Sequence, residues 1–186
     1  GVAYTDRDGD NFYSIGEGRG DLKVSLGSSS VTTFDSGGYS LQTAKGDQTF
    51  TLTGGGLSGA VTVTTTISSN LKIDIVNGDT LLTSGSVTVE GAVKVIKAMA
   101  TGIRVSGGAG DQKIVGSSGD DFLSGGAGND ELLGGEGNDT LLGGGDNDTI
   151  NGGGGADTVD GGTGDDIVVY AGTRATYTVT AMAGGN

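Results

Sequence analysis

The chain of 186 residues contains no cysteine, histidine, tryptophan or proline. Without cysteine and histidine it cannot form a disulfide, a thiolate nucleophile, an imidazole base or a Cys/His metal site. The lack of proline argues against collagen-like and proline-rich disordered chains, which depend on that residue. No apolar run approaches the roughly 20 residues of a membrane-spanning helix, so no membrane insertion is expected. GVAYTDRDGD at the N-terminus is not a signal peptide, and we expect the chain to be a fragment of a larger parent polypeptide.

Basic residues are also scarce, since 10 Lys and Arg face 23 Asp and Glu and the net charge is −13. Thirteen of the acidic residues and one basic residue lie in residues 106–169. Nucleic acids and anionic membranes are poor partners for such a segment, because both are negatively charged. A cation is the partner that this charge favours.

Glycine is the most conspicuous residue that is present, with 41 copies, and from residue 107 it recurs with a period of nine. Seven units begin at Gly107, Gly116, Gly125, Gly134, Gly143, Gly152 and Gly161. Position 8 of each unit is aliphatic: Ile114, Leu123, Leu132, Leu141, Ile150, Val159 and Val168. Position 6 is Gln112 in the first unit and then Asp121, Asp130, Asp139, Asp148, Asp157 and Asp166. Repeats of this regularity predict a stacked solenoid.

Each unit divides into six residues with the glycines and the acidic residue and three with the aliphatic residue. Three residues form a strand of about 10 Å, and glycine permits the positive φ of a tight turn. Two units would complete one coil. Two facing core rows would result, one of Ile114, Leu132, Ile150 and Val168, the other of Leu123, Leu141 and Val159.

Coils about 4.8 Å apart place the acidic residue of each turn near that of the next coil. Two like charges at that distance repel by roughly 0.9 kcal/mol in water, and by several times more at an effective dielectric near 20. A core this narrow cannot offset that repulsion together with the entropy lost by glycine. Carboxylates and backbone carbonyls are hard oxygen ligands that suit calcium. The repeat therefore predicts several Ca²⁺ ions between the turns.

This nine-residue pattern resembles the RTX (repeats-in-toxin, haemolysin-type) calcium-binding repeat. The resemblance implies a parallel β-roll over 107–169, with ions held by aspartate carboxylates and turn-glycine carbonyls. Carried over to this chain, the carboxylates are Asp121, Asp130, Asp139, Asp148, Asp157 and Asp166, and the carbonyl donors are Gly126, Gly128, Gly135, Gly137, Gly144, Gly153, Gly155, Gly162 and Gly164. The chain departs from the pattern at Gln112, at Ser117 in place of a glycine, and at Asp146 in place of the third glycine. These departures predict a capping first unit with a weak or empty site and a distorted turn at 143–148.

A second cation site is predicted by DRDGDNFYSIGE near the N-terminus. Counted from Asp6, the ligand positions of an EF-hand loop fall on Asp6, Asp8, Asp10, Phe12, Ser14 and Glu17. Phe12 would contribute its carbonyl, and Glu17 would bind with both carboxylate oxygens. The sixth position is Asn11 rather than glycine, and asparagine tolerates the left-handed conformation better than most residues.

Residues 1–76 follow a different pattern, with short Thr- and Val-rich segments separated by Gly and Ser. Strands are expected at Val2–Thr5, Leu22–Leu26, Val31–Phe34, Tyr39–Thr43, Thr49–Thr53, Ala60–Ile67 and Leu71–Val76. They predict a small antiparallel sandwich. With the Asp-rich loop, the Glu-Gly-Arg-Gly after it and GGYSL, this part resembles the prealbumin-like, collagen-adhesin B-repeat type of bacterial surface domain.

Two further segments complete the expected organisation. Residues 77–106 are expected to be an extended capping or linking segment, although Ala92, Val95, Ile96, Met99 and Ala100 also fit a helical period. Residues 170–186 look like the closing strands of the roll, and we expect these strands to be truncated. The expected fold class is therefore all-β, an N-terminal antiparallel β-sandwich followed by a calcium-binding parallel β-roll.

No enzyme is expected, because the repeat gives every aspartate the same environment and acid–base catalysis needs groups with separated pKa values. The RTX resemblance implies a non-catalytic, calcium-folded structural module of a secreted or cell-surface bacterial protein that uses type I secretion. One alternative is the C-terminal support and secretion domain of a secreted hydrolase. Another is an adhesin segment that binds a carbohydrate or a protein partner at a cell surface. No nucleic-acid partner is expected.

Overall fold

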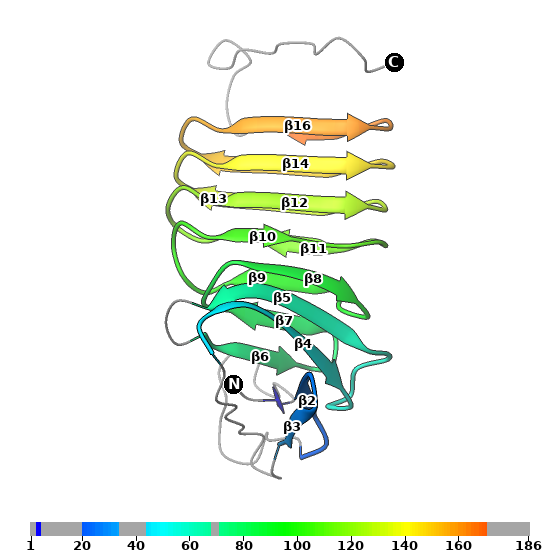
Figure 1. Cartoon of the computed structure of the whole chain (residues 1–186). Coiled ribbons are helices and arrows are strands. Elements are labelled where there is room, and N and C mark those ends of the chain that lie inside the picture. The colour runs from blue at the N-terminus through cyan, green and yellow to red at the C-terminus, as the bar shows by residue number, and fades with distance from the viewer. Residues whose placement is uncertain (1–2, 5–19, 34–43, 68–70, 171–186) are drawn as a thin grey trace. The chain divides into compact units, whose positions relative to one another are not determined.

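The computed structural model describes residues 3–4, 20–33, 44–67 and 71–170 (Figure 1). Within these ranges the chain is all-β and contains no helix. The predicted EF-hand-like loop, the strand expected at 39–43 and the closing strands expected after residue 170 lie outside the described residues. The chain divides into two compact units, Gly1–Met99 and Ala100–Asn186.

The first unit contains nine strands among its described residues: β1 (Ala3–Tyr4), β2 (Lys23–Leu26), β3 (Ser29–Thr32), β4 (Gly46–Thr53), β5 (Val61–Ile67), β6 (Ile73–Val76), β7 (Thr80–Thr83), β8 (Val87–Gly91) and β9 (Val95–Ala98). Strands β3, β2, β4, β5 and β8 lie side by side in that order, and all of these pairs are antiparallel. Strands β1, β6, β7 and β9 form a second series. In it β6–β7 is antiparallel, whereas β1–β6 and β7–β9 are parallel.

Alternation along β5 divides its two faces as the sequence VTVTTTI predicts. Val61 and Val63 are fully buried, whereas Thr62 and Thr64 lie on the opposite, more exposed face. On the neighbouring strand β4, Leu52 is also buried. Burying one face of the antiparallel strands provides the first unit with a core.

The sandwich predicted for residues 1–76 differs from this arrangement in two respects. Strand β5 pairs with β8, and β6 pairs with β7, so the pairing continues beyond residue 76. Two parallel pairs also interrupt the expected antiparallel order. In residues 77–106 the chain forms β7, β8, β9 and β10 rather than the alternative helix. Val95 and Ile96 lie in β9, because cross-strand pairing with β7 outweighs the weak helical period.

The second unit is a parallel β-roll of eight strands: β10 (Arg104–Ser106), β11 (Lys113–Val115), β12 (Phe122–Ala127), β13 (Glu131–Glu136), β14 (Thr140–Gly145), β15 (Thr149–Gly154), β16 (Thr158–Thr163) and β17 (Ile167–Val169). Even-numbered strands β10, β12, β14 and β16 form one sheet, and odd-numbered strands β11, β13, β15 and β17 form the other. The strand pairs of the roll join residues 18 apart, for example Leu123 with Leu141 and Leu132 with Ile150. Two nine-residue units therefore make one coil, as the repeat predicts.

The core of the roll consists of the two predicted rows. Ile114, Leu132 and Ile150 are fully buried in one row, and Leu123 and Leu141 are fully buried in the other. Leucine and isoleucine at position 8 fill the narrow space between the sheets, where an aliphatic side chain gains roughly 1.5–3 kcal/mol from full burial. Val159 and Val168, near the end of the described residues, are only partly buried.

The roll begins one unit earlier than residue 107. Strand β10 pairs with β12 in the register of the repeat, and Val105, which lies nine residues before Ile114, is fully buried at position 8. Ile103 takes position 6 of this additional unit. The unit lacks the glycines of positions 1, 2 and 4 and the aspartate of position 6, so the sequence pattern does not reveal it.

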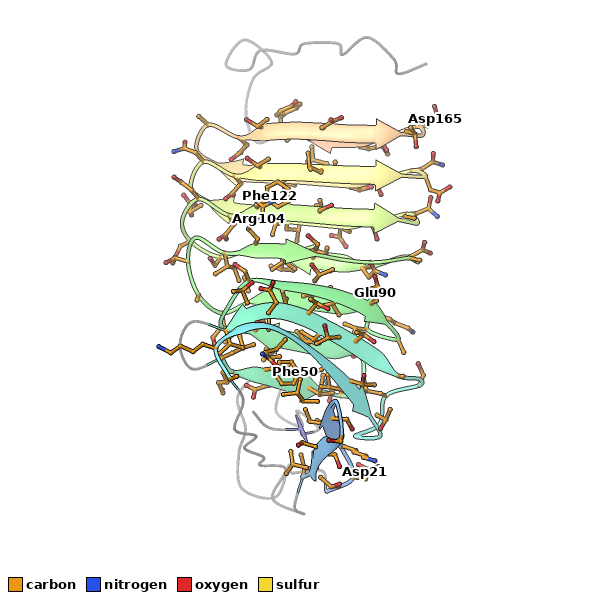
Figure 2. All side chains as sticks on the ribbon, in the orientation of Figure 1. Asp21, Phe50, Glu90, Arg104, Phe122 and Asp165 are labelled. Atoms are coloured by element: carbon orange, nitrogen blue, oxygen red, sulfur yellow. The ribbon has the colours of Figure 1, made fainter. Side chains whose placement is uncertain are left out.

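Exposed side chains also link successive strands of the same sheet. The guanidinium carbon of Arg104 lies 3.5 Å from the centroid of the Phe122 ring, which joins β10 to β12 (Figure 2). On the other sheet, Lys113 Nζ lies 2.7 Å from Glu131 Oε1 and joins β11 to β13. Both contacts are largely solvent-exposed and contribute little to stability, in the range of about 0–1 kcal/mol.

Candidate metal centre

The position-6 aspartates lie at the ends of the turns, directly before each strand. Asp121, Asp130, Asp139 and Asp148 are each at most 3 % exposed, and Asp157 and Asp166 are partly exposed. In each of the six, Oδ1 accepts a hydrogen bond from the backbone N–H of the residue 18 positions earlier, at 2.7–3.0 Å. This row of bonds staples each turn to the preceding coil. All six predicted carboxylates therefore occupy equivalent places in the roll.

The second oxygen of these carboxylates is the unusual one. In Asp130, Asp139 and Asp148, Oδ2 is buried and has no hydrogen-bond partner. A buried oxygen of this kind costs about 1–3 kcal/mol, and more when it is charged. Three such atoms in one regular array indicate that a positively charged partner would stabilise the roll.

Position 1 of the unit must be glycine because of this oxygen. A Cβ built on Gly125 would collide with Oδ2 of Asp130, and the same collision occurs between Gly134 and Asp139. A Cβ on Gly125 would also meet the carbonyl oxygen of Gly143, one coil further on. The missing side chain therefore leaves room for the carboxylate and exposes carbonyl oxygens next to it.

Burial raises the pKa of Asp130 from 3.8 to about 6, and the negative charges of Asp148 and Asp111 add to the rise. The hydrogen bond from the Gln112 N–H opposes this shift. Burial likewise raises the pKa of Asp139, with added repulsion from Asp157 among others. In each case desolvation is the largest cause, since a charged carboxylate is removed from water without a cation beside it. The protein alone therefore provides no positive charge that offsets the burial of these carboxylates.

The pKa of Asp148 is raised for the same reason, with Asp166 and Asp146 adding to the effect of burial. Asp146 occupies the third glycine position of its unit and has φ +72, in the same left-handed region as Gly137 at φ +122. Its Oδ2 accepts a hydrogen bond from Gly128 N–H at 3.2 Å. The sequence predicts a distorted turn at 143–148. In the structure, Asp146 keeps the left-handed conformation of the glycine that it replaces, because aspartate tolerates this conformation.

The predicted carbonyl donors fall into two groups. The position-2 glycines, Gly126, Gly135, Gly144, Gly153 and Gly162, lie inside strands β12 to β16 and take part in the ladders. The position-4 glycines, Gly128, Gly137, Gly155 and Gly164, lie in the turns with positive φ. The structure thus places the position-4 glycines in the turns and the position-2 glycines near the ends of the strands, and the role of their carbonyls as calcium ligands stays a prediction.

Position 5 forms a second row of side chains, which the sequence interpretation missed. This outer row consists of Asp111, Asp120, Asn129, Asn138, Asn147, Ala156 and Asp165, and Figure 2 labels Asp165 at its turn. The side-chain oxygen of Asp111, Asp120, Asn129, Asn138 and Asn147 accepts the N–H of the residue 18 positions later, at 2.7–3.1 Å. Position 6 therefore accepts hydrogen bonds from the preceding coil and position 5 from the following coil, so that each turn is bonded to both of its neighbours. The signal was visible as Asp or Asn at every position 5 except Ala156.

The first nine-residue repeat, residues 107–115, differs from the repeats that follow, as its sequence predicts. Gln112 is buried at position 6 and donates its N–H to Asp130 Oδ1 at 2.7 Å. Its Nε2 donates to Ala109 O at 3.1 Å, so the side chain is held within its own turn. Gln112 is neutral and supplies no charge for a cation.

The donor set fits a hard cation. No cluster of three or more acidic side chains that could hold a metal occurs among the residues that the structure describes. A site here would instead combine single carboxylates from neighbouring turns with backbone carbonyls, and an all-oxygen set of this kind suits Ca²⁺. The buried Oδ2 atoms of Asp130, Asp139 and Asp148 supply the unsatisfied negative charge that such an ion would neutralise.

Comparison with protein families gives two overlapping matches, residues 106–141 and 133–168, to the model of the RTX calcium-binding nonapeptide repeat (4 copies). Together they span about a third of the chain and correspond to the β-roll. Comparison with curated proteins and with solved structures gave no match. The described part of the chain has no helix that is long and apolar enough to cross a membrane.

Proposed function

Since residues 106–168 are RTX calcium-binding nonapeptide repeats, which bind several Ca²⁺ ions, we propose that the roll is a non-catalytic structural module that folds when calcium binds. The repeats indicate a structural module of a secreted protein. The more specific role is a segment of a secreted or cell-surface bacterial protein that leaves the cell unfolded by type I secretion. Where calcium is scarce the carboxylates would keep the coil open, and outside the cell the ions would close it.

One observation carries this proposal: the unpartnered Oδ2 atoms of Asp130, Asp139 and Asp148 in a buried array. Bound Ca²⁺ would supply the positive charge that these oxygens lack. Asp121, Asp157 and Asp166 occupy the same position of their units and are the remaining candidate carboxylates. The binding free energy of the ions would then be folding free energy, because an unfolded chain has no preformed site.

A calcium titration of the whole chain, followed by far-ultraviolet circular dichroism, tests the proposal. We expect the strand signal to be low in excess chelator at pH 7.5 and to rise cooperatively as calcium is added. Magnesium at the same concentrations should restore much less signal, because Mg²⁺ demands a smaller octahedral site and retains its water. A complete strand signal of the roll in chelator would show that the coil does not need metal.

Asp139→Asn provides the specific variant, because it keeps an Oδ1 acceptor for the Asp121 N–H and removes the charge. Asp165→Asn is the matched control. It removes the same charge at an exposed outer-row residue, and asparagine already occurs in this row at Asn147. We expect Asp139→Asn to raise the calcium concentration at the folding midpoint and Asp165→Asn to leave it near the wild-type value. Equal shifts would mean that only net charge matters.

A further inference from the structure

The Asp121 carboxylate differs from the other buried aspartates of the roll. Its Oδ2 accepts the backbone N–H of Ser117 at 2.7 Å and lies 2.8 Å from the Ser117 hydroxyl. In Asp130, Asp139 and Asp148 the corresponding oxygen has no partner. A single residue, Ser117, thus supplies both contacts that set Asp121 apart.

The position of the oxygen confirms the difference. A Cβ on Gly116 would lie 3.1 Å from Asp121 Oδ2, whereas a Cβ on Gly125 would collide with Asp130 Oδ2. The Asp121 carboxylate is therefore turned away from its position-1 glycine. Ser117 occupies position 2, where Gly126 has φ +114, and the non-glycine residues with positive φ in the described part of the chain are Asn77 and Asp146. Ser117 consequently keeps an ordinary φ, which an L-residue prefers.

The Ser117 hydroxyl has two acceptors within reach, since Ala100 O also lies 2.8 Å from its Oγ. A hydroxyl carries one proton and cannot donate to both. The carboxylate is the stronger acceptor because it is charged. The backbone N–H of Ser117 donates to Oδ2 in either case.

We propose that Ser117 takes the place of a cation at Asp121, so that this turn closes without calcium and metal binding starts with the later aspartates. The inference rests on the proposed calcium-dependent folding of the roll. The residues around it agree, because the preceding position-6 residue on the same edge is the apolar Ile103, whose N–H donates to Asp121 Oδ1. On the other edge the first position-6 residue is the neutral Gln112. On each edge of the roll, the first two position-6 residues therefore include only one carboxylate.

Ser117→Gly tests the proposal as a gain of function. Glycine removes the hydroxyl and permits the positive φ of Gly126, whose own N–H leaves Oδ2 of Asp130 without a partner, so Oδ2 of Asp121 should become free in the same way. Ser118→Gly is the matched control, because Ser118 is exposed at position 3, where Gly145 and Gly154 already occur. Equilibrium dialysis of the whole chain against calcium counts the bound ions. We expect Ser117→Gly to bind one more Ca²⁺ than the wild type and Ser118→Gly to bind the same number.

The measurement separates the two proposals. If the wild-type chain binds no calcium, the proposed function fails; if Ser117→Gly folds and binds the wild-type number of ions, only the role of Ser117 fails. Hydrogen exchange of the Phe122 amide, which donates to Ile103 O at 2.9 Å, shows whether the calcium-loaded variant is folded.

If Ser117→Gly does not fold even with calcium, Ser117→Ala and Ser117→Thr decide the question. In chelator, with enough trimethylamine N-oxide to fold the metal-free roll, loss of the hydroxyl should speed exchange of the Ile103 amide about tenfold in Ser117→Ala, whereas Ser117→Thr should keep the wild-type rate. The same rate in all three proteins would overturn the proposal.

Discussion

Replacing Asp130 by asparagine should change the stability of the roll in opposite directions with and without calcium. Asparagine keeps a side-chain oxygen for the Gln112 N–H, which donates to Asp130 Oδ1 at 2.7 Å, and it occupies nearly the same volume. It removes the charge. Without calcium the charge destabilises the folded roll, whereas with calcium the charged carboxylate binds the ion and stabilises the roll.

The magnitude without calcium follows from the raised pKa. Burial and repulsion raise the pKa of Asp130 from 3.8 to about 6, and one pKa unit corresponds to about 1.36 kcal/mol. At pH 7.5 the charged carboxylate therefore destabilises the metal-free roll by about 3 kcal/mol relative to the unfolded chain. Asp130→Asn should recover an energy of this order. Asp130 is only 2 % exposed, so solvent screens little of this effect.

Two titrations at pH 7.5 measure both signs. In chelator, trimethylamine N-oxide favours the compact state, and the osmolyte concentration at the folding midpoint reports the stability of the metal-free roll. We expect Asp130→Asn to lower that midpoint. In a calcium titration, the variant should need about tenfold more calcium than the wild type, which corresponds to about 1.4 kcal/mol.

Asp120→Asn is the control for both titrations. Asp120 is exposed, lies on the opposite edge of the roll, and accepts the Asn138 N–H through an oxygen that asparagine retains. Its substitution removes one charge without touching the Asp130 turn and should shift either midpoint little. The reasoning is refuted if Asp130→Asn weakens the roll in chelator, or if calcium folds the variant and the wild type at the same concentration.

Three other predictions follow from the same geometry. In chelator the roll should gain strand signal as the pH falls from 7.5 towards 4, because the raised pKa of Asp130 makes the folded state bind protons more tightly than the unfolded chain. The stability gained by protonation is complete below about pH 4 and is lost as the pH rises through about 6. An unchanged circular dichroism signal over this range would contradict the prediction. Leu141→Ala should destabilise the calcium-loaded roll by about 2–5 kcal/mol in urea unfolding, because Leu141 is fully buried in a core with no side chain to replace it, and a loss below about 1 kcal/mol would mean that the row collapses around the cavity. Asn138→Ala should cost about 0.5–1.5 kcal/mol by the same assay, because it leaves the Ala156 N–H without its acceptor, whereas no change would show that water replaces the bond.

The nine-residue period by itself determined the coil, the two core rows and the row of position-6 aspartates. A period kept over seven units defines which residues share a face, because each unit must occupy an equivalent place in a stack. Leu132 and Leu141 could therefore be placed in facing rows without coordinates. The likeness to a calcium-binding repeat followed from the same glycines and aspartates.

Residues that break the period could be placed only by the tertiary structure. Val105 and Ile103 extend the roll upstream, because strand pairing with β12 does not require the glycine turn. Parallel pairing of β7 with β9 likewise depends on contacts between residues that no local pattern connects. In the first unit of the chain, alternation in β5 was visible in the sequence, but its partner β8 was not.

The sequence determined which residue types surround each turn, and the structure decided how each carboxylate is satisfied. Asp121 and Asp139 stand at the same position of their units, yet Oδ2 of Asp121 contacts Ser117 and Oδ2 of Asp139 has no partner. The physical reason is that hydrogen bonds depend on direction and on distances of a few tenths of an ångström. A repeat pattern sets the spacing along the chain, whereas only the folded coil sets the distance between two oxygens.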